Sequence, residues 1–222
     1  CGHSPLFLAM HQTHKIDIIA VKRNLFMPVN RSVPDAAEKR KSWNGLMSGF
    51  KASDLVFLDE SGRNTDMTRR YAYLLGGSRA VDSAPLSKPR NTTILSSIQL
   101  DGTLRYTTFS GGTTVERFKR YLETDLLPHL NGNSVLVMDN MKSHHAKAVK
   151  ELLDSSSVRY IYLPPYSPDL NPIEKLWSKV KALLRKFKAR TLDALPNAIQ
   201  NAFHSVAVSD CSGWFCSCGY ML

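Results

Sequence analysis

The stretches LVFLD (residues 55–59) and VLVMD (residues 135–139) decide the fold of this chain. Each places four apolar residues in a row directly before an aspartate. Unbroken apolar runs of this length are typical of strands that are buried on both faces of a sheet. We therefore predict that Asp59 and Asp139 close two buried strands and reach the edge of an α/β sheet, where ligands usually bind.

The sequence around these two runs predicts a mixed sheet. Further strands are expected at residues 71–75, 92–99, 104–109 and 158–164, with Asp101-Gly102 as a hairpin turn between two of them. Helices are expected from Pro34, at residues 113–129 with Thr113 as N-cap, at 145–153, around Glu174 and at 192–206. Hairpin strands followed by alternating helices and strands predict an α/β fold, a mixed sheet with helices on both faces.

Glu174 opens a helix and has two readings. Asn171 and Pro172 fit the N-cap and the first helical position, so the glutamate fits a capping box with a purely structural role. The apolar residues of this helix, however, form one stripe, and Glu174 lies on its flank together with Lys181 and Arg185. An acid at the sheet edge followed by basic residues can bind metal at one end and DNA phosphates along the rest.

The charge balance favours a nucleic-acid partner. Lys and Arg number 29 against 19 Asp and Glu, which gives a net charge of +10 and a pI of about 9.5. A solvated basic surface is the alternative reading, but seven basic residues cluster between Lys175 and Arg190. We expect DNA contacts from Lys175, Lys179, Lys181, Arg185 and Lys186. No apolar stretch approaches the ~20 residues of a membrane span.

Two strand-end aspartates and a helix-start glutamate can converge on a divalent cation. Either aspartate alone is explained equally well as a turn or cap residue, but two matched endings in a basic chain favour a site. Oxygen ligands suit Mg²⁺ or Mn²⁺. Asn140, His144 and Asn171 are expected to support this site as polar neighbours. A histidine-based nuclease is the weaker alternative, because adjacent histidines point in different directions on a helix.

The cysteines do not form a recognisable framework. Cys1 stands alone, and Cys211, Cys216 and Cys218 follow a spacing that lacks the paired CxxC motifs of structural zinc sites. We predict free thiols in an intracellular protein.

Three segments resemble the signature blocks of DDE transposases. They are LDESGRNTDMTRRYA (58–72), VMDNMKSHHAKAV (137–149) and YLPPYSPDLNPIEKLWSKVKALLRK (162–186), and the third is the most specific. The chain is most similar to the mariner-like superfamily, in its bacterial insertion-sequence branch. The resemblance covers roughly residues 34–220, including the ending WFCSCGY, and the 34 residues between Asp139 and Glu174 fit that superfamily's spacing.

The resemblance implies a ribonuclease-H-like fold in which Asp59, Asp139 and Glu174 form the catalytic, metal-binding triad. In the two-metal mechanism that it implies, Asp59 bridges both ions, Asp139 holds one and Glu174 the other, with the ions ~3.5–4 Å apart. The substrate would be double-stranded element DNA, the target a short TA-containing site, and the active species a homodimer assembled on DNA, with no membrane partner.

Family members carry an N-terminal helix-turn-helix module, and here residues 1–33 match poorly. Together with the start at Cys1 rather than Met, this predicts an N-terminally truncated chain. We expect an N-terminal remnant and linker helix (1–50), a ribonuclease-H-like catalytic domain (51–190) and a C-terminal helix and tail (191–222). The chain would act in the bacterial cytoplasm at the nucleoid, or in the nucleus of a eukaryote. A nuclease that cuts without joining and a non-catalytic DNA-binding remnant remain alternatives.

Overall fold

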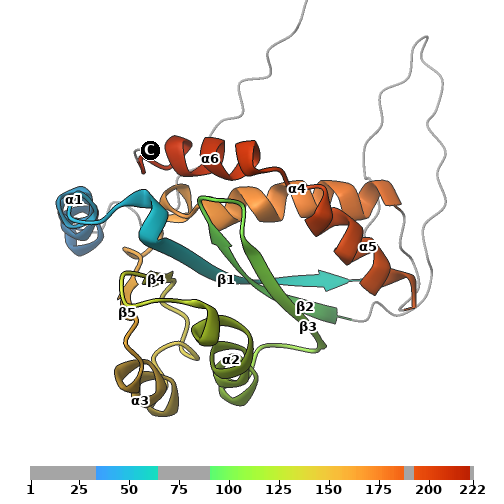
Figure 1. Cartoon of the computed structure of the whole chain (residues 1–222), viewed down its shortest axis with the longest axis horizontal. Helices are drawn as coiled ribbons and strands as arrows, with labels where there is room; N and C mark the ends of the chain where they lie inside the picture. The colour runs from blue at the N-terminus through green and yellow to red at the C-terminus, as the bar shows by residue number, and fades with distance from the viewer. Residues whose placement is uncertain (1–33, 65–90, 188–192, 221–222) are drawn as a thin grey trace, which may run out of the picture.

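The computed structural model describes residues 34–64, 91–187 and 193–220. Within these ranges, five strands form one sheet in the order β3-β2-β1-β4-β5 (Figure 1). The strands are β1 (Leu55–Asn64), β2 (Asn91–Gln99), β3 (Leu104–Ser110), β4 (Val135–Met138) and β5 (Arg159–Tyr162). The first three are antiparallel, whereas β4 and β5 run parallel to β1. The expected mixed sheet is therefore confirmed, and the strand expected at residues 71–75 lies outside the described residues.

Helices cover both faces of the sheet, as predicted. They are α1 (Pro34–Met47), α2 (Val115–Tyr121), α3 (Lys147–Ser155), α4 (Pro172–Phe187), α5 (Ala194–His204) and α6 (Val208–Ser217). Figure 1 shows α4, α5 and α6 on one face and α2 and α3 on the other. A π-helical turn (Leu122–Leu126) and 3₁₀ turns at Ala52–Asp54, Leu127–His129 and Pro168–Leu170 complete the described elements. In the described part of the chain, no helix has both the length and the apolar character of a membrane span.

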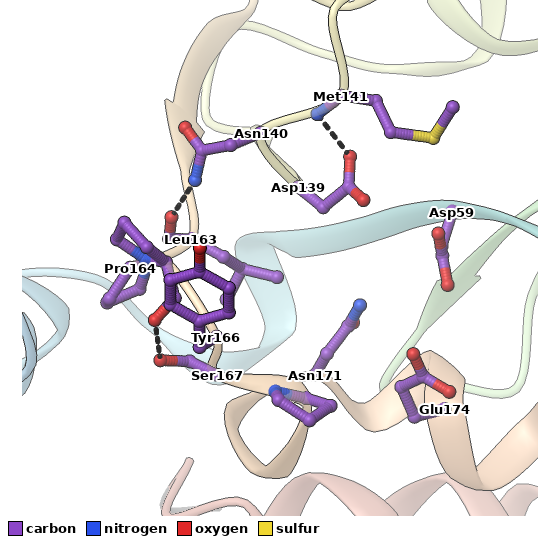
Figure 2. Close-up of a pocket in the computed structure, with 12 residues that line it drawn as sticks. Asp59, Asp139, Asn140, Met141, Leu163, Pro164, Tyr166, Ser167, Asn171 and Glu174 are labelled. Carbon is purple, nitrogen blue, oxygen red and sulfur yellow. Dashed lines mark hydrogen bonds between the residues drawn. The ribbon is translucent and has the colours of Figure 1, made fainter. Parts of the chain in front are cut away.

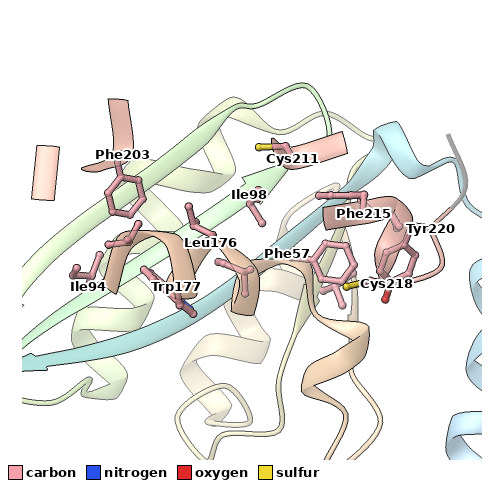
Figure 3. Close-up of a cluster of buried hydrophobic side chains, with 14 of the residues drawn as sticks. Phe57, Ile94, Ile98, Leu176, Trp177, Phe203, Cys211, Phe215, Cys218 and Tyr220 are labelled. Carbon is pink, nitrogen blue, oxygen red and sulfur yellow. The ribbon is translucent and has the colours of Figure 1, made fainter. Parts of the chain in front are cut away.

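Strand alternation explains the two cores. Phe57 of β1 faces α4 and belongs to one buried cluster, while its neighbours Val56 and Leu58 belong to a second cluster with α2 and α3. Figure 3 shows the first cluster, in which Phe57 packs edge-on against Phe215 of α6 with ring centroids 5.4 Å apart. Further members of this cluster are Ile94, Ile98, Leu176, Trp177, Phe203, Cys211, Cys218 and Tyr220. Each strand therefore contributes to both cores, which fixes its register.

Several predicted boundaries were wrong. β1 does not end at Asp59, because antiparallel pairing with β2 carries the strand on to Asn64. The N-cap of α2 is Thr114 rather than Thr113, and its side chain accepts a hydrogen bond from the backbone N–H of Arg117. The expected tail contains a helix, α6, that the sequence analysis did not predict. The hairpin turn is confirmed, with Gly102 at φ 88°.

Both ends of the described chain pack against the loop that precedes α4. Arg40 of α1 forms an ion pair with Asp169 at 2.7 Å and also donates to the hydroxyl of Ser167. Tyr220 accepts a hydrogen bond from Trp43 and donates one to the backbone carbonyl of Leu170 at 2.6 Å. The loop is therefore anchored from α1 and from the segment after α6.

Candidate active site

The parallel pairing of β1 and β4 brings two of the predicted acids together. Leu58 is the register partner of Met138, so Asp59 and Asp139 occupy the next position on each strand path. Both acids fall on the same side of the sheet as Phe57 and Val137, the side that α4 covers. Asp59 lies within β1, whereas Asp139 is the first residue beyond β4.

Glu174 reaches the same place from α4. Its helix buries an apolar stripe against the sheet, and Trp177 of that stripe donates its indole N–H to Oδ2 of Asp59 at 3.0 Å. Trp177 is 1% exposed, so it lies in the core, and its hydrogen bond adds a contact to the site. Figure 2 shows Asp59, Asp139 and Glu174 around one pocket. The structure thus assembles all three predicted acids.

The pocket has a volume of about 440 Å³. One wall of the pocket is the proline-rich loop that follows β5. Tyr166 of this loop has a φ of 55° and is half exposed at the pocket. On the opposite side the exposed side chain of Met141 also lines the cavity. The acids therefore lie in a pocket between this loop and the segment that follows the carboxyl end of β4.

Asp59 has a strongly perturbed electrostatic environment. Burial, followed by the negative charges of Glu174 and Asp139, raises its pKa to about 7, although a backbone hydrogen bond from Glu60 opposes the shift. Three carboxylates facing one pocket repel one another, and a divalent cation among them would remove that repulsion. The acids present therefore suit a cation.

Asp139 is held by different partners. Burial acts to raise its pKa, but the hydrogen bonds from His144 and from the backbone N–H of Met141 outweigh burial and lower it. Nδ1 of His144 lies 2.8 Å from Oδ1 of Asp139, and Nε2 lies 3.3 Å from the carboxylate of Glu60. Burial acts to lower the pKa of His144, yet these two acids raise it to about 10. His144 therefore lies between two carboxylates that both favour its protonated form.

The polar residues predicted to support the site are all close to it. Asn140 donates its side-chain N–H to the backbone carbonyl of Leu163 at 2.5 Å. This hydrogen bond joins the segment after β4 to the segment after β5. Asn171 lines the pocket, and its buried Oδ1 has no hydrogen-bond partner. The capping box expected between Asn171 and Glu174 is therefore not formed. An orphaned oxygen at the pocket instead fits a bound cation or a water attached to one.

Glu60 is the site residue that the sequence analysis missed. It follows Asp59 directly in the chain, so its side chain points to the opposite face of β1. It does not itself follow an apolar residue, and the pattern of an acid after an apolar run therefore does not select it. Glu60, Asp139 and His144 form the group of potential ligands whose atoms lie within 4.8 Å of one another in the described residues. The signal that could have found it is the acid pair Asp59-Glu60.

The predicted DNA-binding residues divide between two sides of α4. Lys179 forms an ion pair with Asp210 of α6, and Lys175 lies close enough to Cys218 to lower the pKa of its thiol, although burial raises that pKa more strongly. Lys181 and Arg185 fall on the flank of Glu174 by helical spacing and are partly exposed. Lys186 is exposed near the end of the helix. Lys181 and Arg185 are therefore the basic residues best placed to extend the pocket.

Comparisons with known proteins give the family to which this chain is similar. Residues 54–196 match the family model described as DDE superfamily endonuclease. The chain is 29% identical over 97 residues to the "Transposable element Tc1 transposase" of Caenorhabditis elegans and 32% identical over 75 residues to the "Transposable element Tcb2 transposase" of Caenorhabditis briggsae. These alignments cover 42% and 34% of this chain, and 36% and 28% of the relatives, so the chain spans about a third of the length of the curated relatives it matches.

Solved structures show the same fold. A pre-cleavage Mos1 transpososome has a TM-score of 0.69 at 17% identity, over 81% of this chain and 58% of that chain. Mos1 paired-end complexes with Mn and with Mg have TM-scores of 0.65 and 0.63 at 18% and 17% identity, over 81% and 88% of this chain and 58% and 63% of those chains. At these identities the likeness shows the ribonuclease-H-like transposase fold alone. Since the family model covers more than half of the sequence, the chain belongs to the DDE superfamily endonucleases.

Proposed function

We propose that this chain is the catalytic part of a Tc1/mariner-type transposase that cuts DNA strands and joins them to a target. The observation that carries the proposal is that Asp59, Asp139 and Glu174 line one pocket. Asp59 comes from β1, Asp139 from the residue after β4, and Glu174 from α4. The family match and the transposase relatives support the same reaction class. Two structural neighbours are described as Mos1 complexes with Mn and with Mg, which supports one of these cations here.

In this proposal the three acids would hold two divalent cations, which would supply Lewis-acid activation of the attacking oxygen and stabilisation of the leaving 3′ oxygen. Water attacks a DNA phosphodiester, the bond to the 3′ oxygen breaks, and a 3′-hydroxyl and a 5′-phosphate result. That 3′-hydroxyl then attacks a target phosphodiester and displaces the target strand's own 3′ oxygen, so that one phosphodiester bond forms as another breaks. Asp59 and Glu174 contribute charge from within the pocket, and His144 fixes the orientation of Asp139.

Lys181 and Arg185 lie on the flank of α4 that carries Glu174, so they would bind DNA phosphates beside the pocket. We propose Lys175, Lys179 and Lys186 as further phosphate contacts, although the ion pair of Lys179 with Asp210 already engages its ammonium. Joining two DNA ends requires two active sites, so we propose a homodimer on DNA. We also propose that the chain belongs to the bacterial insertion-sequence branch and divides into segments 1–50, 51–190 and 191–222. It would act at the nucleoid of a bacterium or in the nucleus of a eukaryote.

Nicking of supercoiled plasmid tests this function. We expect the wild-type chain to nick DNA in Mg²⁺ or Mn²⁺, and Asp139→Asn to bind DNA without nicking it. Joined products from a labelled 3′-hydroxyl oligonucleotide would distinguish a transposase from a nuclease that only cuts. Metal-independent DNA binding without nicking by the wild-type chain would favour the non-catalytic remnant.

A further inference from the structure

We propose that Glu60 and His144 position Asp139 so that it meets a divalent cation through one oxygen, Oδ2. This inference rests on the function proposed above. Glu60 and His144 would be positioning residues for that site, and the side chain of Glu60 lies on the face of β1 opposite to that of Asp59. Neither residue needs to touch DNA.

The orientation of the His144 ring is fixed from three sides. The side chain is fully buried and stacks on Phe118 of α2 with ring centroids 4.2 Å apart. Its Nε2 lies 3.3 Å from the Glu60 carboxylate, and its Nδ1 lies 2.8 Å from Oδ1 of Asp139. Because Nδ1 faces the Asp139 carboxylate and Nε2 faces the Glu60 carboxylate, both ring nitrogens are engaged by acids, and the ring acts as a bridge between them rather than as a metal ligand.

Both donors to the Asp139 carboxylate meet the same oxygen. The backbone N–H of Met141 donates to Oδ1 at 2.9 Å, and the His144 ring approaches Oδ1 as well. Figure 2 shows the other oxygen of Asp139 on the side of the pocket where Asp59 and Glu174 lie. With Oδ1 committed to two N–H groups, Oδ2 is the atom of Asp139 that a cation can use.

Glu60 is the anchor of this chain of contacts. Its side chain is 6% exposed, and its Oε1 lies 3.3 Å from Nε2 of the His144 ring. Because β1 fixes the backbone of Glu60, its carboxylate sets where Nε2 lies, and the ring transmits that position to Asp139. Removing the charge of Glu60 would leave His144 with one anionic partner and allow the ring and Asp139 to move together.

Titration calorimetry of the full chain with MnCl₂ alone, comparing the wild type with Glu60→Gln, tests the proposal. We expect the apparent Kd for Mn²⁺ to weaken by roughly 10- to 100-fold, the range found when a residue that orients a metal ligand is removed. The matched control is Asp154→Asn, which also removes one carboxylate that accepts a side-chain hydrogen bond, here from Tyr160 at 2.7 Å, but away from the pocket. Its Mn²⁺ affinity should equal that of the wild type.

Thermal unfolding in EDTA separates positioning from a merely structural role. A Glu60→Gln chain that stays folded and binds Mn²⁺ as tightly as the wild type overturns the inference while leaving the proposed function intact. A wild-type chain that binds no Mn²⁺ overturns the proposed metal site itself.

A measurement on the wild-type chain removes any dependence on the stability of the variant. The imidazole ¹⁵N resonances of His144 should shift when MgCl₂ saturates the site, because its partner Asp139 binds the cation. The exposed His204 of α5 serves as the reference that does not shift. Saturation without a change at His144 would overturn the inference.

Discussion

Replacing Asp59 by Asn should stabilise the metal-free chain at neutral pH. Asp59 is 8% exposed, and its carboxylate faces two other acids across the pocket. Asparagine has nearly the same shape and keeps an oxygen that can accept the indole N–H of Trp177. The substitution therefore removes the buried charge while preserving the contact, and the change in stability reports the electrostatic strain that a bound cation would relieve.

The magnitude follows from the pKa of Asp59, which is about 7 in the folded chain against 3.8 ordinarily. The folded chain keeps this proton up to about pH 7, whereas the unfolded chain releases it near pH 3.8, so folding takes up a proton between these values. The free energy of unfolding therefore falls as the pH rises through this window. At about 1.36 kcal/mol per pH unit, the group destabilises the folded chain by up to about 4 kcal/mol at pH 8.

Urea unfolding in EDTA at pH 5 and pH 8 measures this effect. Asp59→Asn should be more stable than the wild type at pH 8, and its advantage should shrink by about 3 kcal/mol at pH 5, since about two pH units of the window lie between pH 5 and pH 7. Added Mg²⁺ should stabilise the wild type more than the variant at pH 8. An advantage that does not change with pH would refute the electrostatic reasoning.

Four further predictions concern α4 and the pocket loop. Lys181→Ala combined with Arg185→Ala should weaken binding to all DNA sequences alike and reduce the salt slope by about 2 in a fluorescence titration, whereas an unchanged slope would remove both residues from the interface. Lys179→Ala should lower the free energy of unfolding by up to about 1 kcal/mol, because it breaks the ion pair with α6, and a urea titration that shows no loss would contradict this role. Tyr166→Gly should leave stability unchanged or raise it by about 1 kcal/mol, since glycine accepts a φ of 55° without strain, and a large loss of stability would show that ring packing dominates. Trp177→Phe should reduce stability by about 1 kcal/mol through the lost hydrogen bond to the β1 aspartate, and an unchanged urea midpoint would show that this bond contributes nothing.

The sheet could be predicted because its signal is local. Four apolar residues in a row before Asp139 can only be buried on both faces, and the structure shows β4 buried throughout. Which strands pair with one another is not a local signal. The extension of β1 to Asn64 depends on its ladder with β2, about 35 residues away, and no apolar pattern in residues 60–64 announces it. The helix α6 is short, and its burial against α4 decides it more than its own periodicity does.

The candidate site divides in the same way. Asp59, Asp139 and Glu174 stand out in the sequence, since each acid directly follows an apolar run or opens an amphipathic helix. Glu60 does not stand out in the sequence, because its role depends on contact with His144, which is 84 positions away. The ion pair of Lys179 likewise requires α6 to be in place, since its partner Asp210 comes from that helix. Contacts between elements that are distant in the chain could not be predicted from the sequence.

The most direct test of the central claim is to map the metal site with Fe²⁺. Iron bound in place of Mg²⁺ produces hydroxyl radicals in ascorbate and peroxide, and these cut the polypeptide beside the ion. We predict cuts near Asp59, Asp139 and Glu174 that excess Mg²⁺ suppresses and that Asp139→Asn reduces. Cuts confined to other parts of the chain, or cuts at these residues that Mg²⁺ does not suppress, would contradict the account.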